Sequence, residues 1–339
     1  MHLEASIDSA LYQRIMRLIF GAILSKAVYA AAKLGIADEL ANGPLPIEEL
    51  ARRTETNADA LYRLLRALAG EGLFEEDEPR VFSVTDLGRL ISEGGPASRR
   101  YLSLMFAEQT DPVFEHVLES IRTGQPVATK ALGKPYWDWL AENPDASEIF
   151  NKAMSSGATM RLPTLLPLPL WETATRVVDV GGGNGTALVA LLTKYPHLQG
   201  VVYDLPHIRE EAEQTIAAAG LADRCEFVGG SFFESVPEGG DVYVLLQILH
   251  DWSDEDATRI LRSCRKAIGE DAKLVVLELI VPDGNEQHPS VLLDLQMLVL
   301  LGGRERTEDE WRKLLADGGF RVERISSGER ASALEARPV

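Results

Sequence analysis

Apolar residues in the first part of the chain recur at the spacing of an α-helix. Over residues 8–42 they fall on more than one face of the predicted helix rather than on a single stripe. A small helical domain cannot cover several apolar faces with its own chain alone. The pattern therefore predicts a homodimer that forms through residues 8–42.

Residues 46–91 combine shorter periodic segments with turn signals. A short helix, a turn and a longer helix precede Gly72, and a β-hairpin is expected around Pro79. This is the order of elements in a winged-helix domain. Helical periodicity then continues to a proline-rich stretch at 162–170, whose prolines are expected to break the helix repeatedly. The expected segments are a winged-helix-like dimerisation domain, a helical connection and a C-terminal domain, at residues 1–100, 101–165 and 166–339.

After residue 175 the pattern changes to alternating strands and helices. Strands are expected at 176–180, 200–204, 225–228, 241–246 and 273–280. Helices are expected most clearly at 186–195, 209–219 and 254–268. Residues 321–339 have the pattern of a terminal hairpin. This alternation predicts an α/β domain with a mostly parallel sheet.

A glycine-rich turn follows the first of these strands, with D-x-G-x-G-x-G spacing over residues 179–185. Glycines allow the backbone to approach a ligand closely, and a turn at the carboxyl edge of the first strand lies where α/β sheets bind cofactors. A dinucleotide fingerprint would need glycine or alanine where Thr186 stands, so a nicotinamide cofactor is disfavoured.

A carboxylate stands at the end of the second predicted strand. Asp204 is placed where an acid can accept hydrogen bonds from both hydroxyls of a ribose. A glycine-rich turn alone is often only a tight turn, and a strand-end acid alone is often only a cap. Strand, turn, helix and acid together favour an unphosphorylated nucleoside as cofactor.

Composition and charge narrow the class of protein. The 339 residues, 45% of them hydrophobic and 25% charged, suit two globular domains. The net charge of −18 repels phosphate backbones and anionic membranes at long range. We therefore expect no nucleic-acid partner and no membrane partner.

The cysteines and the apolar N-terminal stretch bear on localisation. Only Cys225 and Cys264 are present, which favours a reducing compartment and predicts a cytoplasmic protein. Lys26 and Lys33 interrupt the apolar stretch at 18–40, so we expect an interior or interface helix rather than a membrane span.

The motifs DVGGGNG at 179–185 and VVYDLPHI at 201–208 resemble the nucleoside-binding motifs of S-adenosylmethionine methyltransferases. The whole chain resembles the small-molecule O-methyltransferases typified by plant caffeic acid O-methyltransferase and bacterial antibiotic-tailoring enzymes. This resemblance implies a Rossmann-like class I methyltransferase domain behind an N-terminal winged-helix dimerisation domain. It also implies S-adenosyl-L-methionine as cofactor and a small, hydroxylated aromatic molecule as acceptor.

The resemblance carries cofactor-binding roles over to particular positions. Those positions are Gly181, Gly183, Asp204, Leu205, Ser231 and Phe232. Two of the family's usual residues differ here. Ser231 replaces an acid on the adenine side, and Leu246 replaces a lysine that often stands four residues before the catalytic histidine. The adenine contact is therefore expected to be weaker or to involve the backbone.

His250 falls where the fourth strand ends, in the segment HDWSDE. An imidazole with an ordinary pKa of about 6.5 can accept the proton of a phenol, and a histidine at a strand end can equally be a structural hydrogen-bonder. The family resemblance implies that His250 is the general base, flanked by Glu278 and Glu305. Carboxylates beside an imidazole fix its tautomer and stabilise the imidazolium.

The acceptor site is implied by the segment FNKAM, which resembles a family helix whose Phe and Met hold the acceptor ring. A Met and a Phe at this helical spacing are more often part of an ordinary core. The positions expected to bind the acceptor are Phe150, Met154, Asp251 and Met297, with Met105, Phe106 and Trp137 as further candidates.

Other functions are less consistent with the sequence. The two cysteines are far apart and have no histidine at ligand spacing, so we expect no metal, and no G-x-S-x-G hydrolase motif is present. A winged-helix regulator would have to bind DNA with Arg63 and Arg66 beside an acidic wing at 75–78. A relative that keeps the fold and cofactor but catalyses hydroxylation, decarboxylation or cyclisation remains an alternative.

Overall fold

The computed structural model describes residues 9–95 and 97–339. They form two compact units, one ending at Gln109 and the other spanning Thr110–Val339. The predicted interface began at Asp8, which lies outside the described residues.

The N-terminal unit has the predicted winged-helix order. Its elements are α1 (Ser9–Lys33), α2 (Ile36–Glu39), β1 (Leu45–Pro46), α3 (Ile47–Arg53), α4 (Ala58–Ala69), β2 (Phe74–Glu78), β3 (Val81–Val84), the 3-10 turn η1 (Gly88–Ile91) and α5 (Arg100–Met105). The strands form an antiparallel sheet in the order β1-β3-β2. Asn57 caps α4 by accepting from two backbone amides, and Gly72 adopts a φ of +81° between α4 and the hairpin.

Helix α1 leaves a long apolar surface exposed within its unit. The exposed side chains are Leu11, Tyr12, Ile15, Leu18, Ile19, Phe20 and Ile23. By length and composition, α1 is the one helix of the described chain that could cross a membrane. A core helix can meet the same criterion, so the expectation of an interior or interface helix at 18–40 stays a prediction.

The C-terminal unit is built on a seven-stranded sheet in the order β6-β5-β4-β7-β8-β10-β9. The strands are β4 (Arg176–Val180), β5 (Gln199–Asp204), β6 (Cys225–Gly229), β7 (Val242–Leu246), β8 (Lys273–Glu278), β9 (Phe320–Ser327) and β10 (Ser332–Pro338). The first five pair in parallel, and β10 pairs antiparallel with β8 and β9. The mostly parallel sheet and the terminal hairpin are confirmed. The insertion of β10 between β8 and β9 was not predicted.

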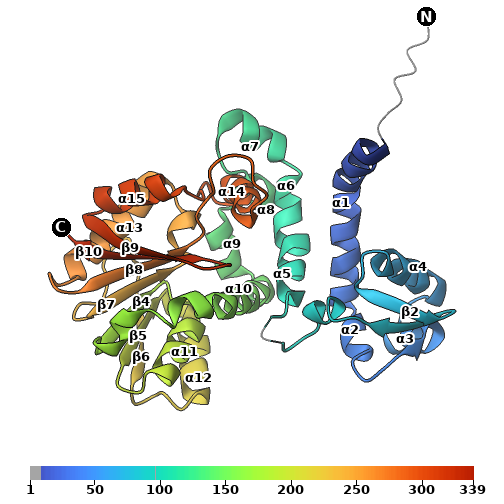
Figure 1. The fold of residues 1–339 in the computed structure, drawn as a ribbon, viewed down its shortest axis with the longest axis horizontal. Coiled ribbons are helices and arrows are strands. Elements are labelled where there is room, and N and C mark those ends of the chain that lie inside the picture. Colours follow the sequence, from blue (N-terminus) through green and yellow to red (C-terminus); the bar gives the residue numbers. More distant parts are fainter. Residues whose placement is uncertain (1–8, 96) are drawn as a thin grey trace, which may run out of the picture. The chain divides into compact units, whose positions relative to one another are not determined.

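Helices cover both faces of this sheet (Figure 1). The helices and short turns of this unit, with η2 at its boundary, are η2 (π-helical, Phe106–Thr110), α6 (Asp111–Phe114), α7 (Val117–Thr123), α8 (Ala128–Leu132), α9 (Tyr136–Glu142), α10 (Pro144–Leu165), η3 (Pro169–Glu172), α11 (Thr186–Lys194), η4 (Pro206–Ile208), α12 (Arg209–Ala218), η5 (Leu249–Asp251), α13 (Asp254–Ala267), α14 (Pro289–Leu300) and α15 (Glu308–Asp317). Neighbouring strand residues alternate between the two faces: Val177 packs with α11 and α12, whereas Val178 packs with α13 and α15.

The proline-rich stretch does not break the helix where the sequence predicts it. Helix α10 continues through Pro163 to Leu165 and ends before Pro167. A proline removes only one helical hydrogen bond, and burial of Leu165 and Leu168 in the core beside α11 offsets that loss. The helix end is anchored by Trp171, whose indole donates to the Leu165 carbonyl at 2.8 Å.

Candidate active site

The glycine-rich turn joins β4 to α11 at the carboxyl edge of the sheet. Gly181, Gly183 and Gly185 have φ values of +74°, +56° and +80°, which glycine adopts without the strain that other residues meet. A Cβ on Gly181 would lie 2.5 Å from the Cδ1 atom of Ile248, whereas a Cβ on Gly183 would meet nothing within 4 Å. The turn is therefore packed tightly on one side and open at Gly183.

Two carboxyl groups lie beside this turn. Asp204 accepts from the amide of Gly183 at 2.8 Å and from the amide of Leu205 at 2.6 Å. Asp179 is buried, and no described residue provides a hydrogen bond to its Oδ1 atom. Burial, with the nearby charge of Asp204, raises the pKa of Asp179 to about 7. An open glycine turn beside a buried acid and a half-buried acid fits a cationic nucleoside that carries hydroxyl donors.

The predicted adenine-side residues follow β6 at the same edge. Gly229 pairs with Asp204 across the parallel strands, so Ser231 and Phe232 come shortly after that pair. The Ser231 hydroxyl accepts from the amide of Phe233 at 3.3 Å and is not an acid–base group. The ring of Phe232 stands edge-on to Trp252 at 5.9 Å. Leu205 is 44% exposed, which leaves its side chain available to a ligand.

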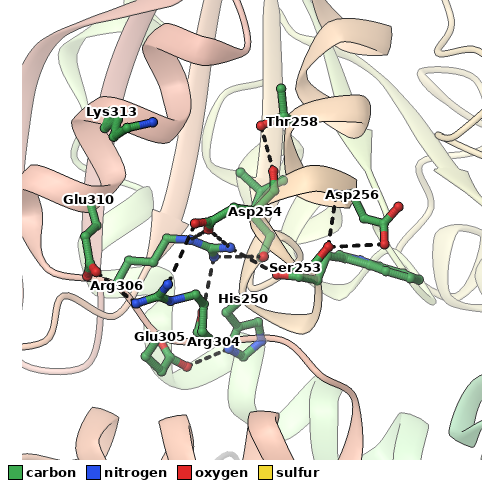
Figure 2. Close-up of polar contacts among 12 residues, drawn as sticks. His250, Ser253, Asp254, Asp256, Thr258, Arg304, Glu305, Arg306, Glu310 and Lys313 are labelled. Carbon is green, nitrogen blue, oxygen red and sulfur yellow. Dashed lines mark hydrogen bonds and ion pairs between the residues drawn. The ribbon is translucent and has the colours of Figure 1, made fainter. Parts of the chain in front are cut away.

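His250 lies in the turn η5, directly after β7. Its Nδ1 atom is 2.6 Å from Oε1 of Glu305, and its Nε2 atom is 3.4 Å from Oδ1 of Asp251. Figure 2 shows the imidazole and the Glu305 carboxylate pointing toward each other. Because a carboxylate accepts, Nδ1 carries the hydrogen of this bond, which fixes Nε2 as the atom left to act on a ligand.

Glu278 contacts the same turn in a different way. Its Oε1 atom accepts from the backbone amides of Ile248 and Leu249 at 3.1 and 3.0 Å, and from that of His250 at 3.4 Å. Its Oε2 atom accepts from the side chain of Gln247 at 2.5 Å. The structure thus brings the three predicted catalytic residues together, but Glu305 bonds to the imidazole and Glu278 holds the backbone that carries it.

The charges around His250 determine its protonation. Burial lowers the pKa of the imidazole, but Asp251, Glu278 and Glu305 together outweigh this effect and raise it to about 10. Burial likewise raises the pKa of Asp251 to about 6 and that of Glu278 to about 7. The site therefore stabilises an imidazolium strongly, and the ring binds a proton more tightly than the ordinary histidine assumed from the sequence.

Arg306 is a buried part of this site that sequence reasoning missed. Its guanidinium donates to the carbonyls of Leu249 and Trp252 at 3.1 and 3.0 Å and to Asp254 at 2.9 Å. It also lies over the ring of Trp311 at 5.0 Å. Figure 2 shows Arg306 between the loop that holds Glu305 and the start of α13. The turn at residues 248–252 is called the catalytic turn below. Glu278 thus accepts from backbone amides of this turn, and Arg306 donates to two of its carbonyls.

The loop before α15 approaches the catalytic turn very closely. A Cβ on Gly303 would lie 2.1 Å from the carbonyl oxygen of His250, and Arg304 donates its amide to that oxygen at 2.9 Å. The amide of Glu305 donates to Asp294 on α14 at 2.8 Å. Glycine at 303 is required for this contact, and the signal for it in the sequence was the Gly-Gly pair itself.

The expected acceptor residues of the C-terminal unit have different surroundings. The rings of Phe150, Trp137 and Tyr136 form an edge-on aromatic cluster with centroids 5.4 to 6.1 Å apart. Met154 is 40% exposed, whereas Met297 is buried. The charge of Asp251 adds to burial in raising the pKa of Tyr136, so the aromatic cluster and the catalytic turn are neighbours. Met105 and Phe106 belong to the N-terminal unit.

His250, Glu278 and Glu305 also have a spacing that a metal ion could use. One potential ligand atom from each lies within 4.8 Å of the others. In the structure these groups bond to protein instead, since the Glu278 oxygens accept from Gln247 and three backbone amides and Nδ1 of His250 donates to Glu305. These contacts therefore fit an imidazole fixed by hydrogen bonds better than a preformed metal centre.

Comparison with known proteins identifies both parts of the chain. Residues 114–321 match the O-methyltransferase domain family, and residues 16–93 match the O-methyltransferase dimerisation domain. Phenazine O-methyltransferase PhzM from Lysobacter antibioticus is 40% identical over 96% of this chain and 96% of its own length. Aclacinomycin 10-hydroxylase RdmB from Streptomyces purpurascens is 37% identical over 87% of this chain and 80% of its own length.

A solved structure relates the fold to a cofactor. The O-methyltransferase NcsB1 from neocarzinostatin biosynthesis was crystallised with S-adenosylmethionine and 2-hydroxy-5-methyl naphthoic acid. It is 33% identical, matches 100% of this chain and 99% of its own with a TM-score of 0.80. Together with the family matches, this shows that the chain belongs to the S-adenosyl-L-methionine-dependent O-methyltransferases.

Proposed function

We propose that the protein transfers a methyl group from S-adenosylmethionine to a hydroxyl of a small aromatic molecule, with His250 as the proton acceptor. The observation that carries this proposal is the buried contact of 2.6 Å between Nδ1 of His250 and Glu305. That contact keeps the Nδ1 hydrogen engaged, so in the neutral ring Nε2 is the atom that accepts a proton, and the contact stabilises the imidazolium that results.

Proton transfer and methyl transfer are linked in this site. The cofactor supplies a methyl group activated on a sulfonium and leaves as S-adenosylhomocysteine. The acceptor hydroxyl gives its proton to Nε2 of His250, and its oxygen forms a bond to the methyl carbon while the carbon–sulfur bond breaks. The carboxylates around the site raise the pKa of His250 to about 10, so the ring in its neutral form accepts the proton of a phenol more readily than an ordinary histidine would.

The residues around the glycine-rich turn suit the cofactor. Asp204 would accept from the ribose hydroxyls, while Gly181 and Gly183 would allow its amino-acid part to approach the backbone. Leu205, Ser231 and Phe232 would frame the adenine. The buried carboxyl group of Asp179 and the half-buried one of Asp204, where ionised, favour a cofactor with a positive sulfonium over a neutral nucleoside.

The acceptor is proposed to be a hydroxylated aromatic natural product. PhzM is named for a phenazine, and NcsB1 was crystallised with a naphthoic acid. Phe150, Met154 and Met297 would provide apolar contacts from the helical connection 101–165 and from α14. The Asp251 carboxylate, 3.4 Å from Nε2 of His250, would accept a hydrogen bond from a polar group of the acceptor.

The protein is further proposed to be a cytoplasmic homodimer. The dimerisation-domain match at residues 16–93 includes most of the exposed apolar surface of α1. Pairing of two such surfaces would remove that area from water. The buried free thiols of Cys225 and Cys264 are consistent with a reducing compartment.

Hydroxylation is the alternative reaction, because the relative RdmB is named a hydroxylase. Hydroxylation does not require a base that removes the proton of a phenol. The contact between His250 and Glu305 therefore favours methyl transfer. The alternative predicts a product that gains an oxygen instead of a methyl group.

The test is a methylation screen with the purified full chain and S-adenosylmethionine. Hydroxylated phenazines, naphthoates and aminobenzoates are offered in turn, and products are identified by mass spectrometry. We expect at least one product that gains one methyl group together with an equal amount of S-adenosylhomocysteine. Oxygen gain without methyl gain would establish the hydroxylase alternative, and cofactor turnover that gives neither product would contradict both.

A further inference from the structure

Gln247 occupies a strained position between the end of β7 and the catalytic turn. Its φ is +54°, in the left-handed region that residues with a Cβ rarely adopt. Its backbone amide donates to the carbonyl of Leu277 at 3.0 Å, so the residue stays attached to β8 while the chain changes direction. Such strain persists only where surrounding contacts hold it, and it is concentrated at functional sites.

The side-chain amide of Gln247 connects two charged groups. Its Oε1 atom accepts from Nη2 of Arg161 on α10, and its Nε2 atom donates to Oε2 of Glu278, both at 2.5 Å. A guanidinium only donates and an ionised carboxylate only accepts, so these partners require one acceptor and one donor on the same short side chain. A glutamine satisfies both, whereas an ionised glutamate or a lysine would satisfy one and repel the other.

The connection continues from Glu278 to the catalytic turn. The second oxygen of Glu278 accepts from the amides of residues 248–250, which include that of His250. On the other side, Gly157 makes room for Arg161, because a Cβ on Gly157 would lie 2.8 Å from the Nη1 atom. A continuous chain of hydrogen bonds thus runs from helix α10 through Gln247 to the backbone of the base.

We propose that Gln247 is a positioning residue for methyl transfer, which fixes His250 relative to helix α10 through Glu278. Helix α10 also carries Phe150 and Met154, so one amide aligns the proton acceptor with the helix that contributes to the acceptor site. The proposal rests on the proposed function, since it concerns the step in which His250 receives the acceptor's proton.

The charges near Glu278 give this proposal a distinctive consequence. The groups that face Glu278 are His250 and Asp251 from the catalytic turn, Glu305 and Arg306 from the loop before α15, and Arg161 through Gln247. The amide of Gln247 stabilises the ionised form of Glu278, whose charge raises the pKa of His250. Changes at Gln247 should therefore alter the titration of a ring that it does not touch.

Two variants separate positioning from general damage. Gln247→Met keeps the length of the side chain and removes both hydrogen bonds, and Gln247→Glu keeps the shape and replaces the donor by a carboxylate. Gln214→Met on α12 is the matched control, because Gln214 is exposed and bonds only to Glu210 on its own helix. Each protein is first compared by thermal unfolding.

We expect Gln247→Met to lower kcat by roughly 10- to 100-fold while the KM for the acceptor changes by less than about threefold. Gln214→Met should keep the wild-type kcat. A double variant with Arg161→Met should lose less than the product of the two single losses, because both changes break one connection. Fully multiplicative losses would show that the two residues act separately and would overturn the proposal.

The second readout does not depend on turnover. The His250 ring is followed by ¹⁵N NMR in histidine-labelled protein and assigned with His250→Ala. Its pKa should fall in Gln247→Met, because Glu278 takes up a proton more readily, and fall less in Gln247→Glu, because the two carboxylates that then face each other share one proton and keep one negative charge. If no acceptor is methylated by the wild type but these graded shifts occur, the proposed function fails and the positioning role stands. Wild-type turnover and an unmoved His250 titration in both variants would overturn the role of Gln247 alone.

Discussion

His250 and Glu305 form a buried hydrogen bond of 2.6 Å between Nδ1 and Oε1, although they are separated by 55 positions in the chain. The Glu305 side chain is fully inaccessible to solvent, and that of His250 is only 9% exposed. An imidazole held this way keeps one tautomer and one orientation, so a hydroxyl that approaches Nε2 of the neutral ring meets a proton acceptor that needs no rearrangement.

The first prediction concerns the imidazole itself. His250→Ala should lower turnover by roughly 10²- to 10⁴-fold, because the acceptor loses its proton acceptor. Affinity for S-adenosylhomocysteine, measured by calorimetry, should change little. Raising the pH should restore part of the rate, since more of a phenol with a pKa of about 10 is then ionised in solution. His197→Ala, which loses one bond to the Trp171 carbonyl, is the control. Wild-type turnover in His250→Ala would remove the base mechanism.

The second prediction concerns Glu305. Glu305→Gln removes a negative charge that helps to raise the pKa of His250, so the pKa of the ring should fall. A neutral imidazole is then present at lower pH, and the acidic limb of the pH profile of kcat/KM should move toward lower pH. The maximum rate should drop, because the ring is a weaker base and its imidazolium is less stabilised. A profile that keeps the wild-type limb would show that another group controls it.

Much of the fold and part of this site follow from local patterns. The glycine-rich turn, Asp204 and His250 each stand at a strand end, and strand ends in a parallel sheet meet at one edge. Local patterns do not give the roles of Gln247 and Arg306. Arg306 contacts Leu249 across 57 positions, and in the sequence it lies in a polar run that looks solvated. Contacts of this kind depend on which strands become neighbours, and periodicity does not specify that.

The third prediction tests the nucleoside site. Asp204→Ala should weaken binding of S-adenosylmethionine and of S-adenosylhomocysteine by roughly 10- to 100-fold, because hydrogen bonds to a charged acceptor contribute about 1.5–3 kcal/mol. The loss should be similar for both ligands, which share the ribose. Calorimetry gives both affinities. Equal binding by the variant and the wild type would contradict the assignment of Asp204.

The fourth prediction concerns Asp179. Its pKa is raised to about 7 in the folded chain from an ordinary value of 3.8, so the folded state holds the proton more tightly than the unfolded state. The contribution of Asp179 to the free energy of unfolding should therefore decline as pH rises from about 4 to about 7 and level off above that range. Asp179→Asn should raise the unfolding temperature of the cofactor-free protein at pH 8 by several degrees. The difference from wild type should vanish near pH 4, and a constant difference at all pH values would exclude this origin.

The fifth prediction concerns the apolar surface of α1. Leu18 is 72% exposed and Ile23 is 67% exposed within the N-terminal unit, and both lie inside the dimerisation-domain match at 16–93. If a second chain covers them, Leu18→Lys with Ile23→Lys buries two cations in an apolar interface, which costs far more than it does on an exposed surface. Light scattering at micromolar concentration should give a dimer for the wild type and a monomer for the double variant. Leu87→Lys, at a residue that is 50% exposed outside α1, should remain dimeric. A double variant that stays dimeric would place the interface elsewhere, and a wild-type monomer would show that no second chain covers α1.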